Sequence, residues 1–478
     1  MVHLVPKQTE ILMEGMTMKN RHIFPIIFII AIGCEKKFEF KPAFPSDCEK
    51  KIGSSHFLWG FECEECIGSI GNSLIEDVDG DGKQEVIVGF AGVKGRIYAL
   101  NGEDGSILWT FKPKGATDCF LSSSADLNGD GKIEVVASCG DYNERKMKVY
   151  ALKGKNGSIL WSHEPSGIPS YTSIGDVDGD GIYEVILQTL CIDKDGVLCS
   201  PHYIYALNGE DGSILWKFES ENPRSYFPPS LGDIDGDGKL EIGSGASELG
   251  GELLILNGGD GSLLWEFYPQ ESIRVPPTYV DMDDDGNLEV IIRGSKHIYA
   301  LRNDGSIIWS VEIGWGGSPL SVGKEGSHLI FLSGDLRAIN ENGEVMWNAN
   351  PPAADAWLSP VIGDIDGDGK LEALHGKHRE LYLINLEDGS FSFFYEEPWD
   401  ERCEDYYSDI FGCMDLSDFF LADVNGDCIL DVVAQFGYKI SVISTGSSVP
   451  PPPLLPWPAF MHDVKRTGLY TGDPYPPW

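Results

Sequence analysis

Hydrophobic residues in this chain occur in short runs, and polar turns rich in glycine separate the runs. The run "EVIVG" (residues 85–89) is followed by "RIYALNG" (residues 96–102), a turn "EDGS" and a last run, "ILWTF" (residues 107–111). These runs are rich in β-branched and aromatic residues, and no long stretch has apolar residues at helical spacing. The pattern predicts short β-strands joined by tight turns.

This group of runs is a repeat, and in most copies an acidic nonapeptide precedes it, after a short strand rich in Ser and Pro. The nonapeptide begins at Asp77, Asp126, Asp176, Asp233, Asp281, Asp364 and Asp423. Residues 321–347 contain the rest of the repeat without an acidic loop, which brings the number of units to eight. Four strands per unit at a period of roughly 40–50 residues are typical of a β-propeller blade. We therefore predict an all-β fold, an eight-bladed β-propeller of four-stranded blades.

A tryptophan recurs near the end of most units, after a small or apolar residue at a fixed distance. The pairs are Ala99/Trp109, Ala151/Trp161, Ala206/Trp216, Ile255/Trp265, Ala300/Trp309 and Ala338/Trp347. A large ring at this place can wedge against the next blade while its indole N–H bonds a backbone carbonyl. We interpret these tryptophans as packing between blades rather than as a carbohydrate platform. The seventh unit has Phe393 near this position.

The eighth unit lacks a last strand, because "KISVISTG" (residues 439–446) runs directly into a proline-rich segment. The isolated segment "FLWGFE" (residues 57–62) resembles the last strand of the other units. We expect this N-terminal strand to complete the eighth blade and so to remove the open sheet edges. The predicted propeller spans residues 56–448, and the segment 449–478 is expected to pack on it.

The charge of the chain gives information about its ligands. The formal net charge is −39, which argues against nucleic acid or anionic lipid as a partner and favours bound cations. Each acidic loop has oxygen-bearing side chains at positions one, three, five and nine, and six of the seven loops have glycine at position six. Hard oxygen ligands in this number suit Ca²⁺, and strands rather than the helices of an EF-hand flank the loops.

The sequence thus predicts up to seven calcium sites, in which the residue at position seven contributes its carbonyl. Whether the last loop binds metal is left open, because Cys428 replaces the position-six glycine. The predicted ligands are Asp77, Asp79, Asp81, Lys83, Glu85, Asp126, Asn128, Asp130, Lys132, Glu134, Asp176, Asp178, Asp180, Ile182, Glu184, Asp233, Asp235, Asp237, Lys239, Glu241, Asp281, Asp283, Asp285, Asn287, Glu289, Asp364, Asp366, Asp368, Lys370, Glu372, Asp423, Asn425, Asp427, Ile429 and Asp431.

The N-terminus has the features of an export signal. Residues 18–34, "MKNRHIFPIIFIIAIGC", combine a basic start with an apolar run that is too short to span a bilayer as a helix. The ending resembles a lipoprotein signal, in which Cys34 would carry the lipid, although Ala31 stands where such signals usually have Leu. We expect residues 1–34 to be the signal, with a misread start before Met18, and residues 35–55 to be a spacer. An ordinary secretory signal is the alternative.

The cysteine count agrees with export to the cell envelope or the extracellular space. Of 11 cysteines, ten remain beside Cys34, an even number that predicts disulfides. Three pairs have the spacing of local staples or neighbouring strands: Cys191/Cys199, Cys403/Cys413 and Cys119/Cys139. The pairing of Cys48, Cys63, Cys66 and Cys428 stays open.

The acidic loops resemble those of the FG-GAP (integrin-α-type) propeller family, whose blades carry Ca²⁺ in DxDxDG loops. The "YALNGEDGSILW" segment resembles the tryptophan-docking repeat of quinoprotein-like propellers, which commonly have eight blades, and residues 457–468 are similar to a C-terminal segment of such chains. The resemblance covers roughly residues 57–470. It implies the fold and the metal more strongly than an activity.

Three functions are compatible with these features. The first, which we favour, is a non-catalytic cell-surface binding or adhesion module. The second is a polysaccharide lyase of the rhamnogalacturonan-lyase type, for which His375, His378 and Arg379 form the best basic group. A surface turn explains that group equally well. The third, a quinoprotein dehydrogenase, is disfavoured because no two cysteines are adjacent, as they characteristically are in that family.

A partner is expected at an insertion rather than at the repeat itself. Residues 395–420 interrupt the repeat with Trp399, Tyr406, Tyr407 and Phe411 among acidic residues. Rigid aromatic side chains are common in recognition surfaces, so this insertion is the predicted contact for a protein or glycan. Packing over the closing blades is the alternative interpretation of these rings. The loop between Cys191 and Cys199 is the second candidate contact.

Overall fold

Thirty-two β-strands and no helix are found among the residues that the structure describes. This computed structural model describes residues 56–448 except 64–72, 92–93, 193–198, 223–226, 247–250, 274, 284, 314–317, 326–327, 350–357, 399–415, 428 and 438. All described residues belong to one unit, Ala43–Trp478. Among them, no helix is long and apolar enough to cross a membrane.

The strands form eight antiparallel sheets of four strands each, and these sheets are the eight blades. Blades one to four consist of β2 (Ser73–Glu76), β3 (Glu85–Phe90), β4 (Arg96–Asn101) and β5 (Ile107–Phe111); β6 (Asp118–Ala125), β7 (Glu134–Asp141), β8 (Lys146–Lys153) and β9 (Ile159–His163); β10 (Ile168–Gly175), β11 (Glu184–Leu190), β12 (His202–Asn208) and β13 (Ile214–Ser220); and β14 (Ser230–Gly232), β15 (Glu241–Ala246), β16 (Glu252–Leu256) and β17 (Leu263–Phe267).

The second half of the ring repeats the same order, and the last blade takes a strand from the start of the chain. Blades five to eight consist of β18 (Thr278–Val280), β19 (Glu289–Arg293), β20 (His297–Leu301) and β21 (Ile307–Glu312); β22 (Ser321–Glu325), β23 (His328–Leu332), β24 (Arg337–Asn340) and β25 (Val345–Asn348); β26 (Val361–Gly363), β27 (Glu372–Lys377), β28 (Glu380–Asn385) and β29 (Phe391–Glu396); and β30 (Leu416–Ala422), β31 (Ile429–Phe436), β32 (Lys439–Ser448) and β1 (His56–Glu62).

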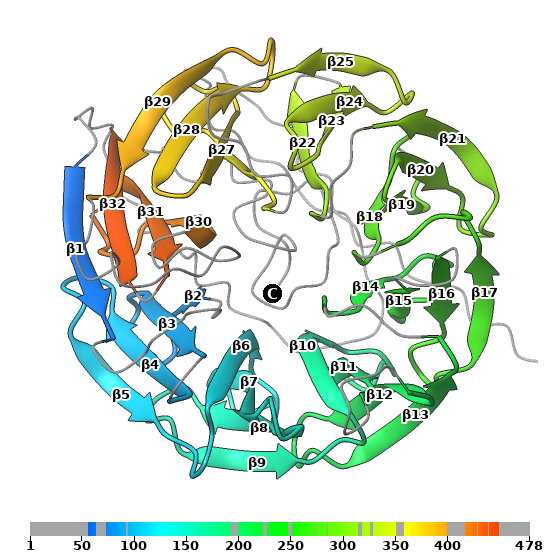
Figure 1. Cartoon of the computed structure of the whole chain (residues 1–478), viewed down its shortest axis with the longest axis horizontal. Helices are drawn as coiled ribbons and strands as arrows, with labels where there is room; N and C mark the ends of the chain where they lie inside the picture. Colours follow the sequence, from blue (N-terminus) through cyan, green and yellow to red (C-terminus); the bar gives the residue numbers. More distant parts are fainter. Residues whose placement is uncertain are drawn as a thin grey trace, which may run out of the picture. The chain divides into compact units, whose positions relative to one another are not determined.

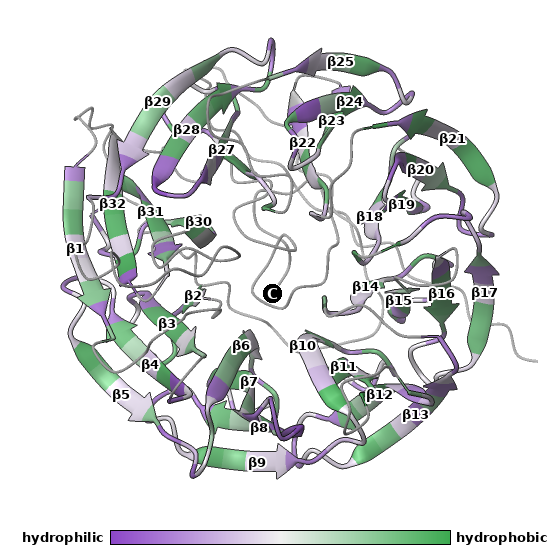
Figure 2. Ribbon diagram, viewed as in Figure 1, coloured by the Kyte–Doolittle hydropathy of each residue, from purple (hydrophilic) through white to green (hydrophobic). Residues whose placement is uncertain are grey.

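The blades follow one another around a ring, with the first strand of each blade innermost (Figure 1). This arrangement confirms the predicted eight-bladed propeller. Hydrophobic residues lie along the strands, whereas hydrophilic residues gather at the turns between them (Figure 2). The core lies between neighbouring blades: Ile87 of blade one packs in one buried cluster with Leu121 and Val135 of blade two. Most joints between blades have a hydrophobic core of this kind, and one larger cluster, which includes Val280 and Tyr382, runs through the two joints from blade five to blade seven.

Strand β1 closes the ring as the sequence predicted. It pairs antiparallel with β32, from His56 opposite Ser444 to Glu62 opposite Lys439. Residues near the two ends of the chain thus share one sheet, and the outer edge of β32 is paired. Trp59 of β1 takes the place that the outer-strand tryptophan holds in the other blades, and its indole nitrogen donates a hydrogen bond to the Gly102 carbonyl of blade one (2.7 Å).

The outer-strand tryptophans join each blade to the next one. The indole nitrogens of Trp109 and Trp161 donate to the carbonyls of Gly154 (2.5 Å) and Gly209 (2.6 Å) in the following blade. Each ring also lies against the glycine of the turn before the outer strand of the next blade. A β-carbon on Gly157, for example, would come within 2.5 Å of the Trp109 ring. These contacts confirm that the tryptophans pack between blades.

Two joints depart from this pattern. The indole nitrogen of Trp265 is buried and has no hydrogen-bond partner. The turn it faces, "LRNDGS" (residues 301–306), is one residue shorter than "LNGGDGS" (residues 256–262). At the joint between blades seven and eight, Phe393 pairs with Tyr382, whereas the tryptophan register would place it opposite Leu383, and its side chain is 58 % exposed.

Two of the predicted disulfides are present in the described part of the chain. Cys119 and Cys139 join β6 to β7, and Cys191 and Cys199 close the base of one loop. Cys63 is disulfide-bonded as well. The predicted pair Cys403/Cys413, and likewise Cys34, Cys48, Cys66 and Cys428, lie outside the described residues.

Candidate metal centres

Each acidic loop connects the innermost strand of a blade to its second strand, and we name each loop by its first residue. In the Asp77 loop, the Asp77 carboxylate accepts backbone hydrogen bonds from Gly80 (2.8 Å) and Gly82 (2.9 Å). Both glycines have positive φ, +80° and +91°, which a residue with a β-carbon adopts only at a cost. The first aspartate and the two glycines therefore fold the loop back on itself.

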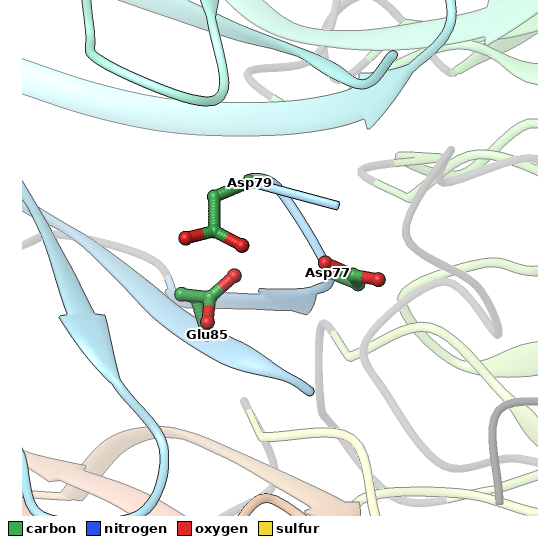
Figure 3. Close-up of side chains that lie close together, drawn as sticks. All are labelled: Asp77, Asp79 and Glu85. Atoms are coloured by element: carbon green, nitrogen blue, oxygen red, sulfur yellow. The ribbon is translucent and has the colours of Figure 1, made fainter. Parts of the chain in front are cut away.

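This fold gathers carboxylates from the two ends of the loop. Side chains from Asp77, Asp79 and Glu85 approach one another across the turn (Figure 3). Five loops in the described part of the chain bring three carboxylates together, each offering an oxygen within 4.8 Å of the others. The groups are Asp77, Asp79 and Glu85; Asp176, Asp178 and Glu184; Asp233, Asp235 and Glu241; Asp281, Asp283 and Asp285; and Asp364, Asp366 and Glu372.

The two remaining loops have asparagine at position three and share part of this hydrogen-bond pattern. Asp126 accepts from the Gly131 backbone nitrogen (2.8 Å), and Asn128 accepts from that of Asp130 (2.9 Å). In the Asp423 loop, the Asn425 side chain accepts from the Asp427 nitrogen (3.0 Å). The position-six residue of that loop, Cys428, lies outside the described residues.

The carboxylate at position five lies outside the close group in four of the five loops. Its oxygen accepts a hydrogen bond from the backbone nitrogen of position seven, as Asp81 does from Lys83 (2.9 Å) and Asp180 from Ile182 (2.8 Å). The Asp281 loop differs, because Asp285 joins the group there and Glu289 does not. In four of the five loops the structure therefore brings together the side chains at positions one, three and nine. The sequence pattern alone does not separate these positions from position five.

The acid at position nine is buried in every loop. Glu85 is 2 % exposed, and its carboxylate accepts a hydrogen bond from the backbone nitrogen of Val78, at position two (3.1 Å). Burial, followed by the nearby charge of Asp79, raises the pKa of Glu85 to about 8. Burial likewise raises the pKa of Glu184 to about 8 and that of Asp431 to about 8. Without a cation, these groups would resist ionisation at neutral pH.

Several carboxylates of the acidic loops have a buried oxygen that accepts no hydrogen bond. Oε1 of Glu241, Oδ1 of Asp364 and Oδ1 of Asp431 are buried and have no hydrogen-bond partner. Leaving a buried polar atom without a partner costs about 1–3 kcal/mol, and more when it is charged. A cation among the loop carboxylates would satisfy these oxygens and offset the repulsion between their charges. The acidic clusters therefore fit metal ions.

The basic group noted in the sequence does not gather around one site. His375 is buried in β27. Arg379 lies in the turn that precedes β28, and its guanidinium binds the Glu396 carboxylate (2.7 Å) and the Glu397 carbonyl (2.7 Å) of the neighbouring outer strand. These contacts hold the arginine within its own blade.

Most of the predicted contact insertion, residues 399–415 with all four of its named aromatic residues, lies outside the described residues. At its base, Glu397 is fully buried and accepts hydrogen bonds from Tyr395 (2.9 Å) and Ser441 (2.7 Å). Glu397 also forms an ion pair with Lys439. This buried anchor was missed in the sequence, where the only signal is that the repeat ends in the acidic stretch "YEEPWDE".

Comparison with known proteins agrees with this repeat structure. A family model described as FG-GAP-like repeat matches residues 77–137, which contain the Asp77 and Asp126 loops. A second model, described as outer membrane protein assembly factor BamB, matches residues 200–368. No curated protein matches the sequence.

Three solved structures illustrate the shared fold. BamB from Moraxella catarrhalis is 15% identical with a TM-score of 0.52, and the match covers 82% of this chain and 99% of that chain. Saccharomyces cerevisiae Sqt1 is 13% identical with a TM-score of 0.56, over 82% and 99% of the two chains. Quinohemoprotein alcohol dehydrogenase from Comamonas testosteroni is 10% identical with a TM-score of 0.53, over 83% and 77%.

At these identities the similarity establishes the fold and not the activity. The repeat models and the ring of eight blades together confirm the family resemblance of the sequence. The chain is an eight-bladed β-propeller in which residues 77–137 resemble an FG-GAP-like repeat and residues 200–368 resemble the BamB model.

Proposed function

We propose that this protein is an exported, calcium-stabilised β-propeller that acts as a non-catalytic binding module at the cell surface. The observation that carries the proposal is the buried acid at position nine of every acidic loop, which in the Glu241 and Asp431 side chains leaves an oxygen without a partner. A buried carboxylate is retained at such a cost when a cation occupies the site.

Calcium is the cation that the donor set favours. The loops offer only oxygen atoms, from aspartate, glutamate and asparagine side chains and from backbone carbonyls, and Ca²⁺ takes six to eight such ligands. Positions one, three and nine would hold the ion, and position five and the position-seven carbonyl would complete the shell. The bound ion would tie the innermost strand of a blade to the second strand. Affinities of about 10⁻⁴–10⁻³ M suffice for such a role outside the cell.

Export is supported by the disulfides. The Cys119–Cys139 and Cys191–Cys199 bonds are of the kind that persists in oxidising compartments. Together with the signal-like residues 18–34, they support a protein of the extracellular space or cell envelope, anchored by lipid at Cys34. Mass spectrometry of the mature chain tests the anchor. A lipid at Cys34 supports it, whereas an unmodified N-terminus beyond Cys34 leaves export without an anchor.

The binding role rests on the insertion at residues 395–420, which we propose contacts a protein or glycan. Its base is held rigidly, because Glu397 bonds to Tyr395 of blade seven and to Ser441 of blade eight. A fixed base lowers the entropy lost when a loop binds a partner. The solved dehydrogenase structure matches this chain in fold only, and no described contact favours a dehydrogenase or a lyase over a binding module.

The test is a glycan and polysaccharide array with the purified protein, run in calcium and in EDTA. A variant in which a short Gly-Ser turn replaces residues 401–415 is compared with the wild type. We expect the variant to keep its melting temperature and calcium content but to lose binding. Retained binding would place the partner elsewhere, and depolymerised polysaccharide would show an enzyme instead.

A further inference from the structure

We propose that four of the acidic loops are positioned for metal binding by a glycine in the next blade, so that the seven sites fall into two affinity classes. The inference rests on the calcium binding proposed above. It concerns the glycine of the "LNG" or "LKG" turn between the third and outer strands, which is present in blades one to four.

In these four blades, the glycine lies directly against the acidic loop of the preceding blade. A β-carbon on Gly258 would come within 2.9 Å of the carbonyl oxygen of Val177, at position two of the Asp176 loop. The corresponding distances are 2.1 Å from Gly102 to the Val424 oxygen, 2.7 Å from Gly154 to the Val78 oxygen and 2.7 Å from Gly209 to the Leu127 oxygen. Only glycine permits so close an approach.

The same glycine also accepts a hydrogen bond from the tryptophan of the preceding blade. The Trp216 indole nitrogen donates to the Gly258 carbonyl (2.6 Å), as Trp161 does to Gly209 (2.6 Å). The loop and the tryptophan of one blade therefore meet on a single residue of the next blade. The position of the loop backbone is consequently set from outside its own blade.

One hydrogen bond connects this contact to the proposed metal ligands. The backbone nitrogen of Val177 donates a hydrogen bond to the Glu184 carboxylate (3.1 Å), and Glu184 lies in the same carboxylate group as Asp176 and Asp178. Moving the Val177 peptide would therefore move the buried acid at position nine. Residues that orient metal ligands in this way commonly change metal affinity by about 10–100-fold when they are altered.

Three loops lack this support. Blade five has the shorter "LRNDGS" turn, and blade six has Glu341 where the glycine would stand, so the Asp233 and Asp281 loops meet no such glycine. Beside the Asp281 loop there is a hollow of about 380 Å³, lined among others by Asp283, Glu289 and Trp309. The Asp364 loop faces blade eight, whose outer strand comes from the N-terminus, so no third-to-outer-strand turn is formed there.

Adjacent glycines provide the test. In Gly258→Ala the new β-carbon collides with the Val177 oxygen, whereas in Gly259→Ala it lies 3.4 Å or more from every neighbour. Calcium titration by isothermal calorimetry and native mass spectrometry should show about tenfold weaker binding at one site in Gly258→Ala and no change in Gly259→Ala. In the wild type, the same titration should resolve four tighter and three weaker ions.

The weakened site must be identified, because the new β-carbon of Gly258→Ala also meets the Leu240 oxygen, next to the Asp233 loop of its own blade. Asp178→Ala removes the Asp176 site, and Asp235→Ala removes the Asp233 site. If Gly258→Ala has no further effect in the Asp178→Ala background but retains its effect in the Asp235→Ala background, the preceding blade is the target. The reverse pattern overturns the inference, as do seven equal sites or an unaffected Gly258→Ala. Absence of any calcium binding would overturn the proposed function as well.

Discussion

At the scale of single residues, the acids of one loop have different roles. Position one folds the loop through backbone hydrogen bonds, position five accepts a backbone hydrogen bond in all seven loops, and position nine is buried with a raised pKa. Only the last of these roles is unfavourable without a metal, because the buried charge then has no counterion. The buried acid would therefore link the proposed calcium binding to stability.

This link predicts an unusual pH dependence for the calcium-free protein. The pKa of Glu85 and Glu184 is raised to about 8, whereas a glutamate in an unfolded chain has a pKa of about 4.3. Between these values the folded state holds more protons, so the free energy of unfolding should fall as pH rises from about 5 to 8. Calcium competes with these protons, and its affinity should rise over the same range. Thermal melts in EDTA across this range test the prediction, and a calcium-free melting temperature that increases towards pH 8 would contradict it.

Removing one ligand should abolish the binding of one ion and lower the stability by the binding energy of that ion. Asp178→Ala should lose one bound calcium and, at calcium a hundred times above Kd, about 2.7 kcal/mol of stability. Glu219→Ala is the matched control, because Glu219 is an exposed acid on outer strand β13 of the same blade. Native mass spectrometry counts the ions, and chemical denaturation measures the free energy of unfolding. Equal effects of the two substitutions would show that the loop acid is only surface charge.

At the scale of strands and turns, the joints between blades are not equivalent. Trp161 donates a hydrogen bond to Gly209, whereas the buried indole nitrogen of Trp265 has no partner. Trp161→Phe should therefore cost about 1 kcal/mol more than Trp265→Phe, since only the first loses a hydrogen bond. Urea denaturation of the two variants measures the difference. A larger loss for Trp265→Phe would contradict this account of the joints.

Strand β1 should be essential for a closed ring. A chain that begins at residue 64 lacks β1, leaves β32 unpaired and removes Trp59 from its joint with blade one. Burial of a tryptophan alone is worth about 3–5 kcal/mol, so the denaturation midpoint should fall steeply. A synthetic peptide of residues 56–63 should restore it, and a scrambled peptide should not. An unchanged midpoint in the shortened chain would show that blade eight is stable with three strands.

The strands and their order were predictable because each unit repeats the same local pattern, including the displaced strand "FLWGFE". The roles within a loop were only partly predictable, since spacing does not show that Asp81 accepts a hydrogen bond from the Lys83 backbone while Glu85 is buried. Contacts between blades could not be predicted from the repeat. The close approach of Gly258 to Val177 joins residues far apart in the chain and depends on the geometry of the ring.

At the scale of the whole molecule, the ring places its acidic loops at equivalent points of seven blades in a chain of net charge −39. Cations in these loops would neutralise carboxylates where they are most crowded and would hold each inner strand to its neighbour. Because four of the loops also contact a glycine of the next blade, loss of the ions should weaken those joints as well as the blades. Stability of the propeller should then depend on calcium as a whole rather than on any single site.

The most direct test of this account is calcium content and melting temperature measured on the same preparation, before and after treatment with EDTA. We predict several calcium ions per chain by elemental analysis, a marked fall in melting temperature on chelation, and recovery when calcium but not magnesium is restored. A protein that contains no metal and melts at the same temperature with and without EDTA would contradict the central claim.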